Sequence, residues 1–220
     1  MRKILLITVL AALAYAGCKK KENDVSTTVT ASYPLITING SQYVTINVGG
    51  TFTPPTATAI DTFYHEKPTV LTDLGSLDNT IPGLYTIVYS AKNHYGFVGT
   101  KNLYVAVTNI SDSLDLSGWY LRLANPNRVA FVTKLSRGMF MTSNAGGADT
   151  SDRTTGPLVP GVFVVTSTSA FTFGNQQTYD GQLSSSAETL MLAVADTELT
   201  YLLNEGSFSP TVLRNFKKQP

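Results

Sequence analysis

The sequence predicts an all-β protein with two folded units, a β-sandwich followed by an antiparallel β-meander that forms a small barrel or a second sandwich. Three observations lead to this fold class. Apolar residues alternate with polar ones in short runs, turn-forming Gly, Pro, Asn and Asp separate these runs, and residues 33–109 contain no convincing amphipathic helix. The 220 residues are 43% hydrophobic, which is enough for a packed core.

Composition and charge exclude several classes of protein. Only 14% of the residues are charged and the formal net charge is +1, which falls to −1 when residues 1–17, with Arg2 and Lys3, are removed. Neither value provides the basic face that nucleic acid requires, so we expect no nucleic-acid partner. A chain with one cysteine, Cys18, has no intramolecular disulfide and no zinc site built from several cysteines.

Residues 1–17 have the layout of a secretory signal peptide. Arg2 and Lys3 form a basic start, an apolar run follows, and small residues close the segment. The apolar run is shorter than the roughly 20 residues that a membrane-spanning helix needs. One interpretation is an ordinary signal peptide with an incidental cysteine behind it.

The other interpretation rests on Ala16-Gly17-Cys18, which resembles a bacterial lipobox, with Tyr15 as a departure from the usual Leu. This resemblance implies cleavage before Cys18 and a diacylglycerol on its sulfur, and attached acyl chains bind membranes firmly. Lys19 replaces the Asp of the best-known inner-membrane retention signal. We therefore predict an outer-membrane lipoprotein, facing the periplasm or the cell surface, with residues 18–32 as lipidated cysteine and flexible tether.

Residues 33–109 carry the signals of the first unit. Val44, Ile46 and Val48 alternate along one face of a strand. A stronger strand follows Pro82-Gly83, with Tyr85, Ile87, Tyr89 and Ala91 on one face. Turn residues at Gly49-Gly50 and at 93–96 separate these strands from their neighbours. About seven short strands in a unit of this length predict a small β-sandwich.

This unit resembles the immunoglobulin-like modules of bacterial surface proteins. The resemblance rests on the runs VGGTFTPPTATAID (48–61), LGSLDNTIPGLYTIVYSAKNHYG (74–96) and LYVAVTN (103–109). It implies an N-terminal immunoglobulin-like β-sandwich that serves as a spacer or a binding module. It also implies that Tyr85 is a corner tyrosine, whose hydroxyl bonds the backbone while its ring packs in the core.

Residues 110–117 are a polar linker, and residues 118–220 form the second, C-terminal β domain. Apolar alternation, which begins with Trp119, Leu121 and Leu123, and Gly- or Asn-containing turns predict a meander of antiparallel strands there. The segment VTKLSRGMFMTSNAGGADTSDR (132–153) resembles the C-terminal part of Bacteroidetes-type lipoproteins of unknown function, which pair an immunoglobulin-like module with a second β domain. This resemblance implies the architecture and the cellular address, but no reaction.

No residue pattern predicts catalysis, and we expect no enzyme, no cofactor and no metal. His65 and His94 are the only histidines, and neither has a recognisable catalytic or metal-binding partner in the sequence. Oxygen ligands for calcium occur at Asn144, Asp149 and Asp152, but their spacing favours a solvated turn. Glycosidase acids are conceivable only if the fold brings two carboxylates close together. The candidate pairs are Glu198 with Glu205 and Asp180 with Asp196.

Aromatic residues in loops are the predicted ligand-binding residues: Phe63, Tyr64, Tyr95 and Phe97. Exposed rings on loops can stack on sugars or anchor proteins. The alternative is that Phe63 and Phe97 cap the sandwich core. We expect a lipid-anchored, non-catalytic cell-envelope binding protein that captures glycans near a nutrient-uptake system. The first rival is a structural or adhesive protein that contacts envelope proteins, and a carbohydrate-active hydrolase is the second.

Overall fold

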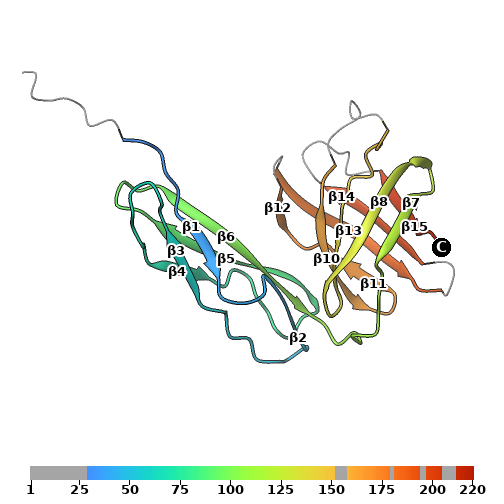
Figure 1. Ribbon diagram of the computed structural model, residues 1–220. Helices are drawn as coiled ribbons and strands as arrows, with labels where there is room; N and C mark the ends of the chain where they lie inside the picture. The colour runs from blue at the N-terminus through green and yellow to red at the C-terminus, as the bar shows by residue number, and fades with distance from the viewer. Residues whose placement is uncertain (1–28, 152–157, 179–180, 194–196, 205–211) are drawn as a thin grey trace, which may run out of the picture. The chain divides into compact units, whose positions relative to one another are not determined.

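Strands are the only regular elements in the parts of the chain that the structure describes. The computed structural model describes residues 29–151, 158–178, 181–193, 197–204 and 212–220 (Figure 1). These ranges contain fifteen strands, so the all-β prediction is confirmed. Within the same ranges there is no helix with the length and apolarity needed to cross a membrane.

The first six strands form two facing sheets. Strands β1 and β3 pair in a two-stranded antiparallel sheet, and the second sheet has the order β2-β6-β5-β4. In that sheet β2 runs parallel to β6, and the other pairs are antiparallel. The strands are β1 (Leu35–Ile38), β2 (Tyr43–Ile46), β3 (Ala57–Ile60), β4 (Val70–Asp73), β5 (Gly83–Lys92) and β6 (Val98–Val107). The sequence predicted about seven strands here, and the described residues contain six.

Alternation along β5 and β6 builds the core of this sandwich. Ile87 and Tyr89 of β5 and Leu103 and Val105 of β6 are buried on the same side of their sheet because successive side chains of a strand point to opposite faces. The Tyr85 hydroxyl donates a hydrogen bond to the Ile81 carbonyl at 2.9 Å, and its ring packs against this core. The corner-tyrosine prediction is therefore confirmed.

The C-terminal strands form one long antiparallel meander. Its order is β11-β10-β9-β8-β7-β15-β14-β13-β12, so the first strand of the meander pairs with the last. The sheet curls, and the Leu190 amide of β13 donates to the carbonyl of Ser169, just before β11, at 2.9 Å. This half-barrel confirms the predicted meander. The strands are β7 (Gly118–Arg122), β8 (Asn125–Ser136), β9 (Met139–Thr142), β10 (Gly161–Ser167), β11 (Ala170–Thr172), β12 (Gln176–Thr178), β13 (Gly181–Met191), β14 (Glu198–Asn204) and β15 (Leu213–Lys218).

Aromatic side chains fill the interior of the half-barrel. Phe163 lies 5.6 Å from Phe140, 5.4 Å from Phe171 and 5.5 Å from Phe173, measured between ring centroids. Such ring pairs contribute about 0.5–1.5 kcal/mol each beyond the area they bury. The curled sheet therefore encloses a packed core, and binding surfaces must be sought on loops and outer faces.

Residues Ser32–Pro220 form one compact unit, and a third apolar cluster lies within it. In this cluster Leu84 and Ala106, from β5 and β6, are buried together with residues of β9 and β10. The Thr108 hydroxyl donates to the Val165 carbonyl at 2.7 Å nearby. Burial of both apolar and polar groups thus links the sandwich strands to the meander strands.

Candidate functional site

Four rings gather at one end of the sandwich and form the aromatic tip, which consists of Phe63, Tyr64, His94 and Tyr95. Phe63 and Tyr64 come from the turn between β3 and β4, and His94 and Tyr95 from the turn between β5 and β6. The Tyr64 ring lies 4.6 Å from Tyr95, 5.2 Å from His94 and 4.9 Å from Phe63, between centroids. Two turns that are thirty residues apart in the chain therefore present one aromatic surface.

The aromatic tip is open to solvent. Phe63 is 56% exposed and Tyr95 is 42% exposed, and neither belongs to an apolar core cluster. The alternative in which Phe63 caps the sandwich core is therefore wrong. Phe97 lies apart from the tip, half-buried, with its ring 5.5 Å from that of Tyr33. Three of the four predicted aromatic residues thus lie together, joined by His94.

A buried carboxylate, Asp61, holds the two turns in place. Its Oδ1 accepts hydrogen bonds from the amides of Phe63 and Tyr64 at 3.1 and 3.2 Å, and its Oδ2 accepts one from Asn93 Nδ2 at 2.8 Å. The Ser32 hydroxyl also donates to Oδ1, at 2.7 Å. Burial raises the pKa of the Asp61 carboxyl, but these four hydrogen bonds outweigh it and hold the pKa below its usual value.

Asn93 completes this network, which we call the Asp61 hub and which comprises Asp61, Asn93 and Ser32. Besides its bond to Asp61, Asn93 Nδ2 donates to the Ser32 carbonyl at 2.9 Å. Its Oδ1 accepts from the Phe97 amide at 3.0 Å, so all the bonding groups of this buried side chain are occupied except one acceptor lone pair. The hub ties both aromatic turns to the segment that precedes β1.

Glu66 forms a second link between the turns. Its backbone pairs with Asp61, its carboxylate accepts from the His94 amide at 3.2 Å, and the same carboxylate contacts His94 Nδ1. His65, with a φ of 55°, reverses the chain just before it. Within the described ranges, no three His, Cys, Asp or Glu side chains are grouped as a metal site would require.

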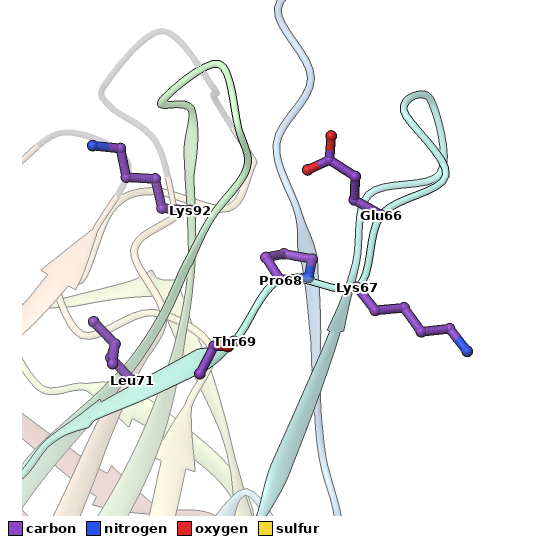
Figure 2. A pocket seen from close by; sticks show the side chains of 6 residues that line it. All are labelled: Glu66, Lys67, Pro68, Thr69, Leu71 and Lys92. Atoms are coloured by element: carbon purple, nitrogen blue, oxygen red, sulfur yellow. The ribbon is translucent and has the colours of Figure 1, made fainter.

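Beside the tip lies an open hollow of about 460 Å³. In Figure 2 the side chains of Lys67 and Lys92 point away from each other, and the Glu66 carboxylate lies between their amino groups in this view. Polar and apolar groups both contribute to the hollow, since its lining residues are Glu66, Lys67, Pro68, Thr69, Leu71 and Lys92. Stacking rings next to hydrogen-bonding groups is an arrangement that can hold a sugar ring.

The outer face of the meander carries a second exposed aromatic group, which the sequence interpretation missed. Trp119 of β7 and Phe131 of β8 are cross-strand partners with ring centroids 4.8 Å apart, and Trp119 is 58% exposed. They border a mostly apolar hollow of about 600 Å³. The period-2 pattern identified Trp119, Leu121 and Leu123 as one face, but Tyr120 and Arg122 point inward instead.

Two buried arginines at the end of the meander core were also missed. The Arg214 Nε donates to the Gly146 carbonyl at 3.0 Å, and its Nη1 donates to the Val212 carbonyl at 2.8 Å. The bonds of Arg122 to the Gly147 and Leu213 carbonyls are longer, both 3.4 Å, and its buried Nε has no partner. These contacts hold the loop that contains Gly146 and Gly147 against the end of the meander core, so the role of both arginines is structural.

Other predicted positions are accounted for as follows. The Asn144 side-chain amide donates to the Val129 and Ala148 carbonyls at 2.9 Å and accepts from the Ala148 amide, so it shapes its own turn. Asp149 accepts from Ser151 in the same loop. The following positions lie outside the described residues: Cys18, Asp152, Asp180, Asp196 and Glu205.

Comparison with known proteins identifies the first unit. Residues 36–107 match the family described as a bacterial surface protein, Ig-like domain, which fits a protein of the cell envelope. A crystal structure of a lipoprotein from Bacteroides thetaiotaomicron aligns with 23% sequence identity and a TM-score of 0.38, covering 84% of this chain and 100% of that chain. No curated protein matches the sequence.

Proposed function

We propose that this chain is a lipid-anchored, non-catalytic binding protein of the bacterial outer membrane, and that its aromatic tip captures saccharides. The observation that carries the proposal is the exposure of rings from two turns on a rigid polar support. Rings from the two turns contact one another and form one exposed aromatic patch, and contiguous exposed apolar patches mark binding sites.

The tip has the properties that sugar binding requires. Flat rings stack on the apolar faces of pyranose rings, and the neighbouring hollow supplies the charged groups of Glu66, Lys67 and Lys92 for sugar hydroxyls. The Asp61 hub fixes the backbone beneath the rings, so less conformational entropy is lost when a ligand binds. Capture of glycans near a nutrient-uptake system would use such a site.

A saccharide array, followed by calorimetry on any ligand found, tests this proposal with the chain lacking residues 1–21. We expect Phe63→Ala and Tyr95→Ala each to weaken binding by about tenfold or more, equivalent to about 1.4 kcal/mol. Trp119→Ala is the matched control, because Trp119 is equally exposed but lies on the meander. Folded protein that binds no saccharide, or tip variants that bind like the wild type, would contradict the proposal.

The proposed anchor is tested separately. We expect Cys18→Ala to abolish lipid labelling and to move the protein from the membrane fraction to the soluble fraction. If this substitution left membrane fractionation unchanged, the lipidation proposal would be refuted. The proposal that the tip binds saccharides would be unaffected.

One observation favours the rival function, contact with an envelope protein. The Trp119–Phe131 pair and its apolar hollow resemble the aromatic anchors that dominate protein interfaces. Under this rival, a partner protein co-purifies with the wild type and is lost in Trp119→Ala, while Phe63→Ala retains it. The two proposals therefore predict opposite sensitivities for the same two variants.

A further inference from the structure

The chain enters its folded unit beside the aromatic tip. Ser32 is bonded to Asp61 and Asn93, which lie directly under the two tip turns. Pro34 is pressed against β6, since a Cβ added at Gly99 would lie 1.9 Å from the Pro34 carbonyl oxygen. Both tip turns and the segment before β1 therefore lie at the same end of the sandwich (Figure 1).

The length of chain before this point limits how far the tip can lie from the proposed anchor. Cys18 precedes Ser32 by fourteen residues. Fully extended, fourteen residues span at most about 50 Å. As a flexible chain, they have a root-mean-square span of about 20 Å. A lipid on Cys18 therefore keeps Ser32, and the hub beneath the tip, within about 50 Å of the membrane surface.

The chemistry of the tip suits that surface. Phe63, Tyr95 and Tyr33 are exposed at this end of the sandwich, and tyrosine rings favour the boundary between apolar and aqueous phases. Lys67, between β3 and β4, and Lys92, at the end of β5, are also exposed and point away from each other (Figure 2), and neither forms an ion pair with a described residue. Lysines near a membrane surface attract anionic headgroups.

We infer that the saccharide bound by the aromatic tip is the headgroup of a glycolipid in the same membrane that holds the chain's anchor. This inference rests on the proposed function and names the source of its ligand. Because the anchor and the glycolipid lie in one membrane, the second contact resembles an intramolecular one, for which a short flexible linker gives an effective concentration in the millimolar range. An open hollow with weak intrinsic affinity is then sufficient, which agrees with the shallow site beside the tip.

The single cysteine allows a direct test on the mature chain, residues 18–220. Cys18 is coupled to a maleimide phospholipid in vesicles, which reproduces the anchor at its natural position. Phe63→Trp in a Trp119→Phe background places the only tryptophan at the tip, and the wild-type chain, whose only tryptophan is Trp119, is the control. Spin labels on the lipid headgroups then quench whichever tryptophan approaches them.

Three vesicle compositions separate the sources of contact: phosphatidylcholine alone, phosphatidylcholine with phosphatidylglycerol, and phosphatidylcholine with lipopolysaccharide. We expect strong quenching of the tip tryptophan only with lipopolysaccharide, reversed by the saccharide freed from its lipid, while Trp119 in the control is unaffected. Tyr95→Trp in the same background repeats the measurement, in case substitution of Phe63 itself weakens binding.

Two results would overturn the inference. One is equal quenching of the tip tryptophan and Trp119 on lipopolysaccharide vesicles. The other is equal quenching of the tip on vesicles with and without saccharide, which would indicate contact with the bilayer alone. Calorimetry of the same variants with soluble saccharides separates this inference from the proposed function. Binding in solution without quenching leaves the proposed function standing, whereas the absence of both removes both.

Discussion

Replacing Asn93 by alanine should release the aromatic tip from its support. The substitution removes the bond to Asp61 at 2.8 Å, the bond to the Ser32 carbonyl at 2.9 Å and the bond from the Phe97 amide at 3.0 Å. A bond to a charged group contributes about 1.5–3 kcal/mol net and a neutral bond about 1 kcal/mol. The expected loss in the free energy of unfolding is therefore about 3.5–5 kcal/mol, a large share of the roughly 5–15 kcal/mol typical of a folded protein.

Urea denaturation followed by circular dichroism measures the global loss, and hydrogen exchange at the Phe63 and Tyr64 amides measures the local one. Both amides are bonded to Asp61, so they should lose protection in Asn93→Ala. Asn39→Ala is the control, because Asn39 is exposed and its side chain makes one bond, to Thr56 at 3.0 Å. Its cost should stay within about 0.5 kcal/mol. A loss below about 1 kcal/mol in Asn93→Ala, with unchanged exchange, would refute the role given to the hub.

Three further predictions follow from the same geometry. Because the pKa of Asp61 is lowered in the folded state, its contribution to stability is complete above about pH 4 and is lost as the pH falls through the folded pKa. The protection of the tip amides, taken relative to the intrinsic exchange rate at each pH, should fall on acidification, and Asp61→Asn should abolish this pH dependence. Arg122→Met should leave the free energy of unfolding unchanged or raise it by about 1 kcal/mol. The guanidinium is buried, its two hydrogen bonds are long and its Nε has no partner, so its charge is already disfavoured. Arg214→Met should cost about 2–4 kcal/mol, and equal melting temperatures for the two variants would contradict this difference. Gly99→Ala should expel Pro34 from β6 and increase proteolysis of the segment before β1, and an unchanged digestion pattern would argue against it.

Local patterns predicted the strands well because alternation acts through neighbours in the chain. Ile87 and Tyr89 are on the face of β5 that the sequence assigned to them, and both are buried in the sandwich core. Tyr85 was predictable for the same reason, since its hydroxyl bonds a carbonyl only four residues away. Features of this kind can be predicted from neighbouring residues alone, because they do not depend on contacts with distant segments.

The features that the sequence did not predict depend on contacts between distant segments. The Asp61 hub joins residues 32, 61 and 93, and no local pattern indicates that these three positions meet. For β7, alternation identified two faces but not which one points inward. Tyr120 occupies the core because its hydroxyl bonds the Leu116 carbonyl, and Trp119 is consequently left on the outer face. Hydrophobicity and size alone would have placed Trp119, rather than Tyr120, in the core.

The Asp61 hub also explains how exposed rings can stay ordered at one end of the sandwich. Rings in loops without support would sample many conformations, and ordering them would consume binding energy. Asp61 fixes the backbone at Phe63 and Tyr64, and Asn93 fixes the turn that carries Tyr95. The same hub binds Ser32, so it also fixes the point at which the chain enters the sandwich. The tip is therefore preorganised, which is the property that the proposed saccharide binding requires.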